Sequence, residues 1–196
     1  MNFGLIRASR DFGRDDWLAG TACERVEIEI GPGNCGYLLA AARRDPACLH
    51  VGIEVQASCL ARVRDRARSR GLLPANLRLL EGDGGWIVRH LLAAASVDAF
   101  HVYFPDPWWK KRHHKRRIFQ ADFCQALGRT LVPGGAVHVV TDVAPLFAEI
   151  TERMEAAGFL ARPWDRETPE AASAYEHKYR RQGRHFQQAV FTLRVR

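Results

Sequence analysis

Residues 29–36 read Glu-Ile-Gly-Pro-Gly-Asn-Cys-Gly, and this stretch decides the fold class. It follows the apolar run 26–30, which is typical of a buried strand, and it precedes a helical pattern over residues 38–44. A loop of the form GxGxxG uses glycine for a tight turn and for the close approach of a ligand to the backbone. The stretch therefore predicts the first strand–loop–helix unit of an α/β domain.

Strand and helix patterns alternate along the rest of the chain. Apolar runs predict strands over residues 49–54, 77–80, 97–104 and 136–141, and an alternating pattern predicts a last strand over 187–195. Helical patterns cover residues 58–70, 119–131 and 145–157. Short connections between the two kinds of element predict a mostly parallel, doubly wound sheet with both faces covered. Ligands bind at the carboxyl ends of the strands in such a sheet, so the residues after each strand are the functional candidates.

Composition limits the classes of protein that fit. A chain of 196 residues with 47% hydrophobic residues can form one domain with a buried core, and we expect a single domain over residues 1–196. That length leaves no room for a separate substrate domain. No apolar run approaches a membrane span, and residues 1–20 lack a signal-peptide core, so a cytoplasmic protein is expected. The five cysteines show no CxxC or zinc-ligand spacing, which predicts reduced, mostly buried thiols and no metal.

Positive charge is concentrated in two places. Residues 110–117, hereafter the basic segment, read Lys-Lys-Arg-His-His-Lys-Arg-Arg and contain six Lys or Arg and no acid. Residues 162–196 contain eight Lys or Arg and four acids, whereas residues 1–109 have no net charge. Clustered cations are the pattern expected for binding a polyanion, because neutralised phosphates release their counterions. A solvated basic loop is the simpler alternative.

One acidic residue stands at or just after the end of each of the first four predicted strands: Glu29, Glu54, Asp83 and Asp106. A carboxylate at Glu54 can accept both ribose hydroxyls, and that pattern fits either NAD or S-adenosylmethionine. Glu29 favours the latter, because it would repel a pyrophosphate but attract a sulfonium or an ammonium group. Asp83 could accept from the adenine amine, or it could simply cap a helix. The glycines could likewise serve the turn alone.

The fourth strand ends in Phe-Pro-Asp-Pro-Trp-Trp, residues 104–109, directly before the basic segment. Two prolines flank Asp106 and restrict the backbone that carries its carboxylate. Trp108 could form a stacking wall or belong to the core. The tip therefore places an oriented acid next to a phosphate-binding surface.

These motifs resemble the bacterial tRNA (guanine-N7-)-methyltransferase family. The resemblance rests on the following stretches, of which the one after the fourth strand is the most specific: 29–33, 52–54, 82–83, 104–108, 110–113, 115–117, 133–135, 141–142 and 173–176. It implies a Rossmann-like S-adenosylmethionine-dependent methyltransferase fold with an antiparallel last strand. It also implies methyl transfer to N7 of guanine 46 in the variable loop of tRNA.

The resemblance assigns roles by position. Cofactor contacts are implied for Glu29, Gly31, Gly33, Glu54, Asp83 and Asp106, and Asp106 is also the implied catalytic acid. Substrate contacts are implied for Lys110, Asp142, Ser173 and Glu176. RNA contacts are implied for Lys111, Arg112, His113, Lys115, Arg116 and Arg117. Residues 162–196 are expected to form a substrate-contacting segment and the last strand, and residues 1–25 a short N-terminal extension that lacks an RNA arm.

The chain departs from the family pattern at Ser173, which replaces a usual Thr, and at Trp109, which replaces a frequent Pro. Three other readings remain open at this point: a methyltransferase acting on another RNA base, a small NAD oxidoreductase, and a tRNA-binding module without catalysis. An amino-methyltransferase would carry a D/N-P-P-Y/F tip, which residues 106–108 do not match. The chain could act as a monomer or a homodimer.

Overall fold

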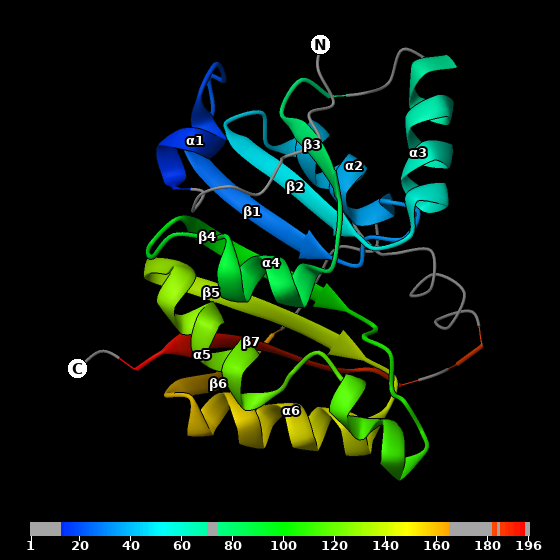
Figure 1. The fold of residues 1–196 in the computed structure, drawn as a ribbon, viewed down its shortest axis with the longest axis vertical. Helices are drawn as coiled ribbons and strands as arrows, with labels where there is room; N and C mark the ends of the chain where they lie inside the picture. Colours follow the sequence, from blue (N-terminus) through cyan, green and yellow to red (C-terminus); the bar gives the residue numbers. More distant parts are fainter. Residues whose placement is uncertain (1–12, 70–73, 165–181, 184, 195–196) are drawn as a thin grey trace.

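The computed structural model describes residues 13–69, 74–164, 182–183 and 185–194 (Figure 1). The elements run in the order α1 (Arg14–Leu18), β1 (Arg25–Ile30), α2 (Gly36–Arg44), β2 (Cys48–Glu54), α3 (Ala57–Ser69), β3 (Leu77–Glu81), α4 (Gly84–His90), β4 (Val97–Tyr103), η1 (Lys111–Arg116), α5 (Ala121–Thr130), β5 (Leu131–Thr141), α6 (Ala144–Ala156), β6 (Phe159–Pro163) and β7 (Gln187–Leu193). η1 is a 3₁₀ helix formed by the basic segment.

The strands form one seven-stranded sheet in the order β3-β2-β1-β4-β5-β7-β6. Strands β1 to β5 are parallel to one another, and β7 is antiparallel to both β5 and β6. The arrowheads of β1 and β5 accordingly point to the same side in Figure 1. This topology confirms the prediction of a mostly parallel, Rossmann-like sheet with an antiparallel last strand.

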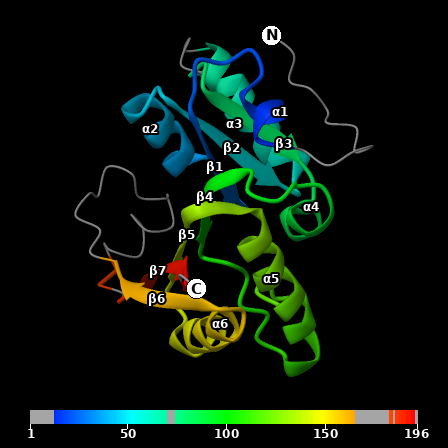
Figure 2. The same ribbon diagram turned by 90° about the vertical axis from the view of Figure 1, so that its left-hand side faces the viewer.

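Helices cover both faces of the sheet. One face carries Ile28, Val51 and Phe100, which pack with the buried side chains of α4, α5 and α6. The opposite face carries a smaller cluster built from α2, α3 and the sheet, centred on Leu38 and Val63. Figure 2 shows α2 on one side of the sheet and α4 and α5 on the other. Strand β2 is buried along its whole length, as expected for an inner strand of a doubly wound fold.

Some elements lack a clear sequence signal. The short α4 begins with two glycines, which are poor helix formers. Strand β6 has only Phe159 buried, so it shows no alternation. The fifth strand was predicted over 136–141, after a helical pattern ending at 131, but β5 begins at Leu131 and therefore contains residues 133–135. There the pairing with β4 shifts register, from Val97 with Leu131 to Ala99 with Ala136.

A row of buried and half-buried polar side chains lies between α2 and the sheet. This polar stripe consists of Tyr37, Glu27, His50, His101, Tyr103 and His138. The Nε2 atom of His101 lies 3.0 Å from Oε2 of Glu27, and its Nδ1 atom lies 2.8 Å from the Tyr103 hydroxyl. The His101 ring stacks on that of His138 with centroids 4.8 Å apart. Burial tends to raise the pKa of Glu27, but the hydrogen bond and the attraction of His101 prevail and lower it to about 2.

Candidate active site

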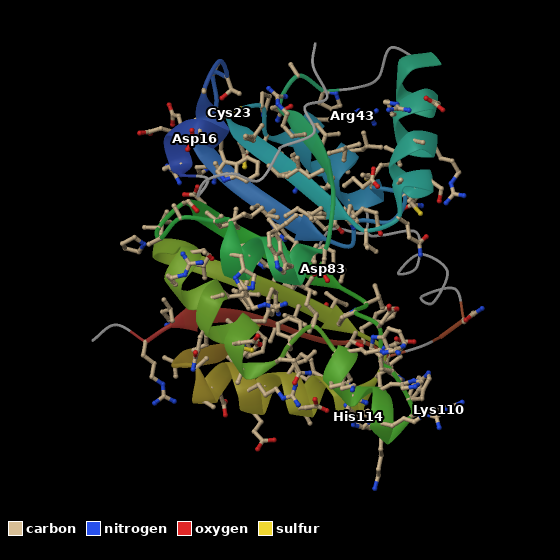
Figure 3. All side chains as sticks on the ribbon, in the orientation of Figure 1. Asp16, Cys23, Arg43, Asp83, Lys110 and His114 are labelled. Carbon is tan, nitrogen blue, oxygen red and sulfur yellow. The ribbon has the colours of Figure 1, made fainter. Side chains whose placement is uncertain are left out.

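The predicted acidic residues come together at the carboxyl edge of the sheet. Glu29 pairs in register with Gly52 on one side and with His101 on the other, and Glu54 pairs with Glu81. The strand ends are therefore nearly level, which places the loops after β1 to β5 along one edge. Figure 3 labels Asp83, Lys110 and His114 toward this side of the molecule.

The glycine loop after β1 has the conformation that its sequence predicts. Gly31 and Gly33 have φ angles of 71° and 53°, in the left-handed region that favours glycine. A Cβ atom placed on either residue would meet nothing within 4 Å, so the backbone here faces open space. Gly52 serves packing instead, because a Cβ atom there would lie 2.6 Å from Leu38 and 3.0 Å from Pro32.

Two buried carboxylates border this loop. Glu54 is 7% exposed, and its two carboxylate oxygens accept from the backbone N–H groups of Gly33, at 3.1 Å, and of Gln56, at 3.0 Å. Glu29 is 3% exposed. Burial raises the pKa of the Cys35 thiol, and the negative charges of Glu29 and Glu54 raise it further. The edge is thus strongly negative, and Cys35 is a neutral packing residue within it.

Asp83 occupies the N-cap position of α4. Its Oδ1 atom accepts from the backbone N–H of Trp86 at 2.9 Å. This is the capping role that the sequence left open, and it engages one of the two carboxylate oxygens. The second oxygen keeps acceptor capacity at the end of β3.

The tip after β4 is held in an unusual backbone conformation. Phe104 and Trp108 have φ angles of 51° and 45°, a region that is strained for large side chains. Between them stands Asp106, whose side chain is exposed. The tip is anchored by the N–H of Phe104, which donates to the carbonyl of Val140 at 2.7 Å, and by Arg117, whose Nε donates to the carbonyl of Pro107 at 2.8 Å.

The basic segment divides into two kinds of residue. Seven of its eight side chains are exposed or half-exposed without an acidic partner among the described residues: Lys110, Lys111, Arg112, His113, His114, Lys115 and Arg116. Arg117 differs, because its side chain is 11% exposed and forms an ion pair with Glu149 of α6. Trp108 packs against this segment, with the Arg116 guanidinium 4.9 Å from its ring centroid. It is half-buried and belongs neither to the core nor to an open wall.

The remaining predicted substrate residues fall in two groups. Lys110 is exposed at the start of η1, and Asp142 is half-buried just after β5. Ser173 and Glu176 lie outside the described residues. Glu149 supports the site through its ion pair with Arg117, and it was not predicted from the sequence. It stands 32 residues from Arg117, and no motif signals the pairing.

A possible metal-binding group lies elsewhere in the described part of the chain. Side-chain donor atoms of Glu27, Cys48 and His50 lie within 4.8 Å of one another, in the first half of β1 and β2. No motif signals this group, because its members come from two neighbouring strands. All five cysteines have free thiols, and Cys35, Cys48 and Cys124 are buried.

Comparison with known proteins places this geometry in context. Residues 24–193 match the family described as "Putative methyltransferase". A tRNA (guanine-N(7)-)-methyltransferase of Nitrosomonas eutropha is 41% identical over 140 residues, covering 71% of this chain and 61% of that protein. One of Halorhodospira halophila is 34% identical, covering 98% of this chain and 84% of that protein. The structure of the 16S rRNA methyltransferase KamB shares the fold, with a TM-score of 0.65 and 16% identity over 95% of this chain and 96% of that one.

The helices of the described residues were compared with the length and hydropathy of a membrane-spanning helix. None of their helices combines the length and the apolar character that crossing a membrane requires.

Proposed function

We propose, from the premise that this chain belongs to the tRNA (guanine-N7-)-methyltransferase family, that it transfers a methyl group from S-adenosylmethionine to N7 of a guanine in tRNA. Position 46 in the variable loop is the target that the family resemblance implies. The observation that carries the proposal is the attachment of the basic segment to the Asp106 tip, at the same sheet edge as Glu29 and Glu54.

The residues at this edge fit S-adenosylmethionine. Gly31 and Gly33 leave open space in front of the loop, where a ligand can approach the backbone. Glu29 and Glu54 give the loop a negative field suited to a cationic ligand, and Glu54 keeps acceptor capacity for ribose hydroxyls beside its two backbone bonds. A dinucleotide pyrophosphate would be repelled by the same field, which disfavours the NAD alternative.

When bound, S-adenosylmethionine supplies an electrophilic methyl group, whose carbon–sulfur bond breaks as N7 of guanine forms the new bond. N7 has an in-plane lone pair and no proton, so the protein needs no general base for this step. The positive charge passes to the purine ring. On this proposal the carboxylate of Asp106 or Asp142 stabilises that charge and accepts from guanine N1–H or N2–H. Asp106 thus orients and stabilises the base without removing a proton.

The polyanion is held by the basic segment. The residues of the basic segment without acidic partners present a cationic surface that begins at Lys110, four positions after Asp106. Phosphates bound there would place the nucleotide beside the tip. On this proposal residues 1–196 form one methyltransferase domain, residues 162–196 add substrate contacts through Ser173 and Glu176, and the enzyme works in the cytoplasm with tRNA.

Incubation of the protein with methyl-labelled S-adenosylmethionine and unmodified bulk tRNA, followed by nucleoside analysis, tests the proposal. Label in 7-methylguanosine is expected, together with a loss of at least about 100-fold in rate for Asp106→Asn. Thermal unfolding shows whether that variant is still folded, and calorimetry measures its affinity for the cofactor. Label in a different nucleoside would overturn the base assignment, and no label with cofactor bound would favour the binding module. A rate that follows one ionisation near neutral pH and loses this dependence in Asp106→Asn would contradict the role without proton transfer.

A further inference from the structure

Trp109 is the most exposed large apolar side chain in the described ranges. It is 73% exposed, compared with 45% for Trp86 on α4. Scattered surface apolar residues require no explanation in general. The position of Trp109 does, because it stands between the strained tip that carries Asp106 and the basic segment.

The two adjacent tryptophans have opposite environments. Trp108 is held against η1 by Arg116 and by an edge contact with His113, whose ring centroid lies 5.8 Å away. The left-handed φ of 45° at Trp108 turns the chain before Trp109. The first indole is therefore packed inward, and the second is left in solvent.

The backbone around Trp109 is fixed on both sides. Pro107 accepts from Arg117 at 2.8 Å, and the N–H of His113 donates to the carbonyl of Lys110 at 2.7 Å. An indole has only two side-chain torsions to immobilise. A ring on such a support can bind a flat ligand with little loss of conformational entropy.

The chemistry around the ring indicates which flat ligand fits. Aromatic faces beside Lys and Arg are the combination that proteins use for single-stranded nucleic acid, where bases stack and phosphates pair with the cations. The described residues near Trp109 in sequence, 110–116, supply cations and no carboxylate. An apolar protein partner would be poorly matched to such a border.

The proposed reaction itself requires unstacked bases. N7 lies on the major-groove edge of guanine, and the major groove of an A-form helix is too deep and narrow for side chains to reach. The target nucleotide must leave its stack, which exposes the ring face of a neighbour. Trp109 is three positions after Asp106, so their Cα atoms are at most about 11 Å apart. That span reaches a base flanking the target.

We propose that Trp109 is a nucleobase-binding residue, which stacks on an unpaired base next to the guanine held by Asp106. This inference rests on the proposed function for the identity of the RNA. It assigns to Trp109 an affinity term that does not depend on salt, in contrast to the phosphate contacts of the basic segment.

The test is binding of an unmodified tRNA transcript at several salt concentrations to the wild-type protein and to Trp109→Ala, Trp109→Phe and Lys111→Ala. Stacking predicts that Trp109→Ala weakens binding about tenfold at every salt concentration and leaves the salt slope unchanged. Trp109→Phe should retain most of the affinity, because it keeps an aromatic face. Lys111→Ala should make the slope shallower. Thermal unfolding and cofactor titration check that each variant is folded.

Wild-type affinity in Trp109→Ala, or a loss that appears only as a changed salt slope, would overturn the proposal. So would a change of oligomeric state by light scattering with tRNA affinity intact, which would make Trp109 a protein contact. Nucleoside analysis of the same reactions keeps the two proposals apart. Tight, Trp109-dependent binding without 7-methylguanosine would overturn the proposed function but leave the stacking role standing.

Discussion

The polar stripe and the basic segment are both rich in titratable side chains, but the protein treats them in opposite ways. In the stripe, the half-buried Glu27 and the buried His101 satisfy each other across neighbouring strands. In the basic segment, Lys111 and Lys115 are exposed and have no acidic partner in the described residues. Buried polar groups that are paired internally stabilise a fold, whereas unpaired exposed charges of one sign are available to a ligand. Three substitutions break or sharpen this contrast.

Glu27→Gln should have the largest effect, because it removes the central charge of the polar stripe. A pKa of about 2 in place of the ordinary 4.5 corresponds to about 3 kcal/mol of stabilisation at neutral pH. We expect the free energy of unfolding to fall by up to that amount and Tm to fall by about 10 °C. Chemical denaturation measures the first quantity and calorimetry the second. An unchanged Tm would show that the stripe does not stabilise the fold.

The pH dependence of the same variant gives a second readout. Since the folded-state pKa of Glu27 is lowered, its stabilisation is complete above about pH 4.5 and is lost as the pH falls toward about 2. Burial also lowers the pKa of His50, so protonation of this histidine in the unfolded chain further destabilises the fold in acid. Glu27→Gln should therefore flatten the acid limb of the stability curve. A wild-type acid limb in the variant would contradict this assignment.

Arg117→Ala should have an intermediate effect. Arg117 belongs to the basic segment, but its side chain forms contacts within the protein. It links the tip to α6 through Pro107 and Glu149. We expect a loss of about 1–2 kcal/mol in stability, together with slower methyl transfer. Arg117→Lys should not restore the rate, because an ammonium group cannot make both contacts in the geometry of a guanidinium. Arg116→Ala is the matched control and should leave Tm unchanged; equal Tm losses in both would remove the distinction.

Lys115→Ala should have the smallest effect on the molecule and act only through RNA. Its exposed ammonium has no internal partner in the described residues, so Tm should not change. The slope of log affinity against log salt should fall by about 0.7 to 0.9, the value for one phosphate contact. Arg44→Ala removes one positive charge at the far end of α2 and should leave the slope as it is. Equal slopes for the two variants would indicate binding through net charge alone.

The fold followed from the sequence where apolar runs are bounded by glycine or proline. The strand 26–30, in which Val26, Ile28 and Ile30 alternate with two glutamates before the glycine loop, and the buried strand β2 are examples. The edge strand β6 was not predicted, because Phe159 alone is buried and the remaining positions show no alternation of apolar and polar residues. The start of β5 at Leu131 was not predicted, because the proline and glycines at 133–135 are equally typical of a loop and of an irregular strand.

The site could be predicted as far as topology determines it. Glu54 and Asp106 follow parallel strands, and such strands end at one edge whatever else the chain does. The bond from Arg117 to Glu149 could not be predicted, because it depends on how α6 packs beside η1. The exposure of Trp109 also depends on a local twist, the left-handed φ of Trp108, which no residue type in the tip signals.

The tip from Phe104 to Trp108 has a consequence for chain entropy. Pro105 and Pro107 have fixed φ angles even in the unfolded chain, and Phe104 and Trp108 are held in left-handed wells once the tip is anchored. Asp106 is the one residue of the five whose φ is not restricted by either device. The prolines lower the backbone entropy that folding the tip loses, whereas Phe104 and Trp108 lose theirs in full and adopt strained angles as well. The anchored tip therefore holds Asp106 in place, and the bound nucleotide adjusts to it.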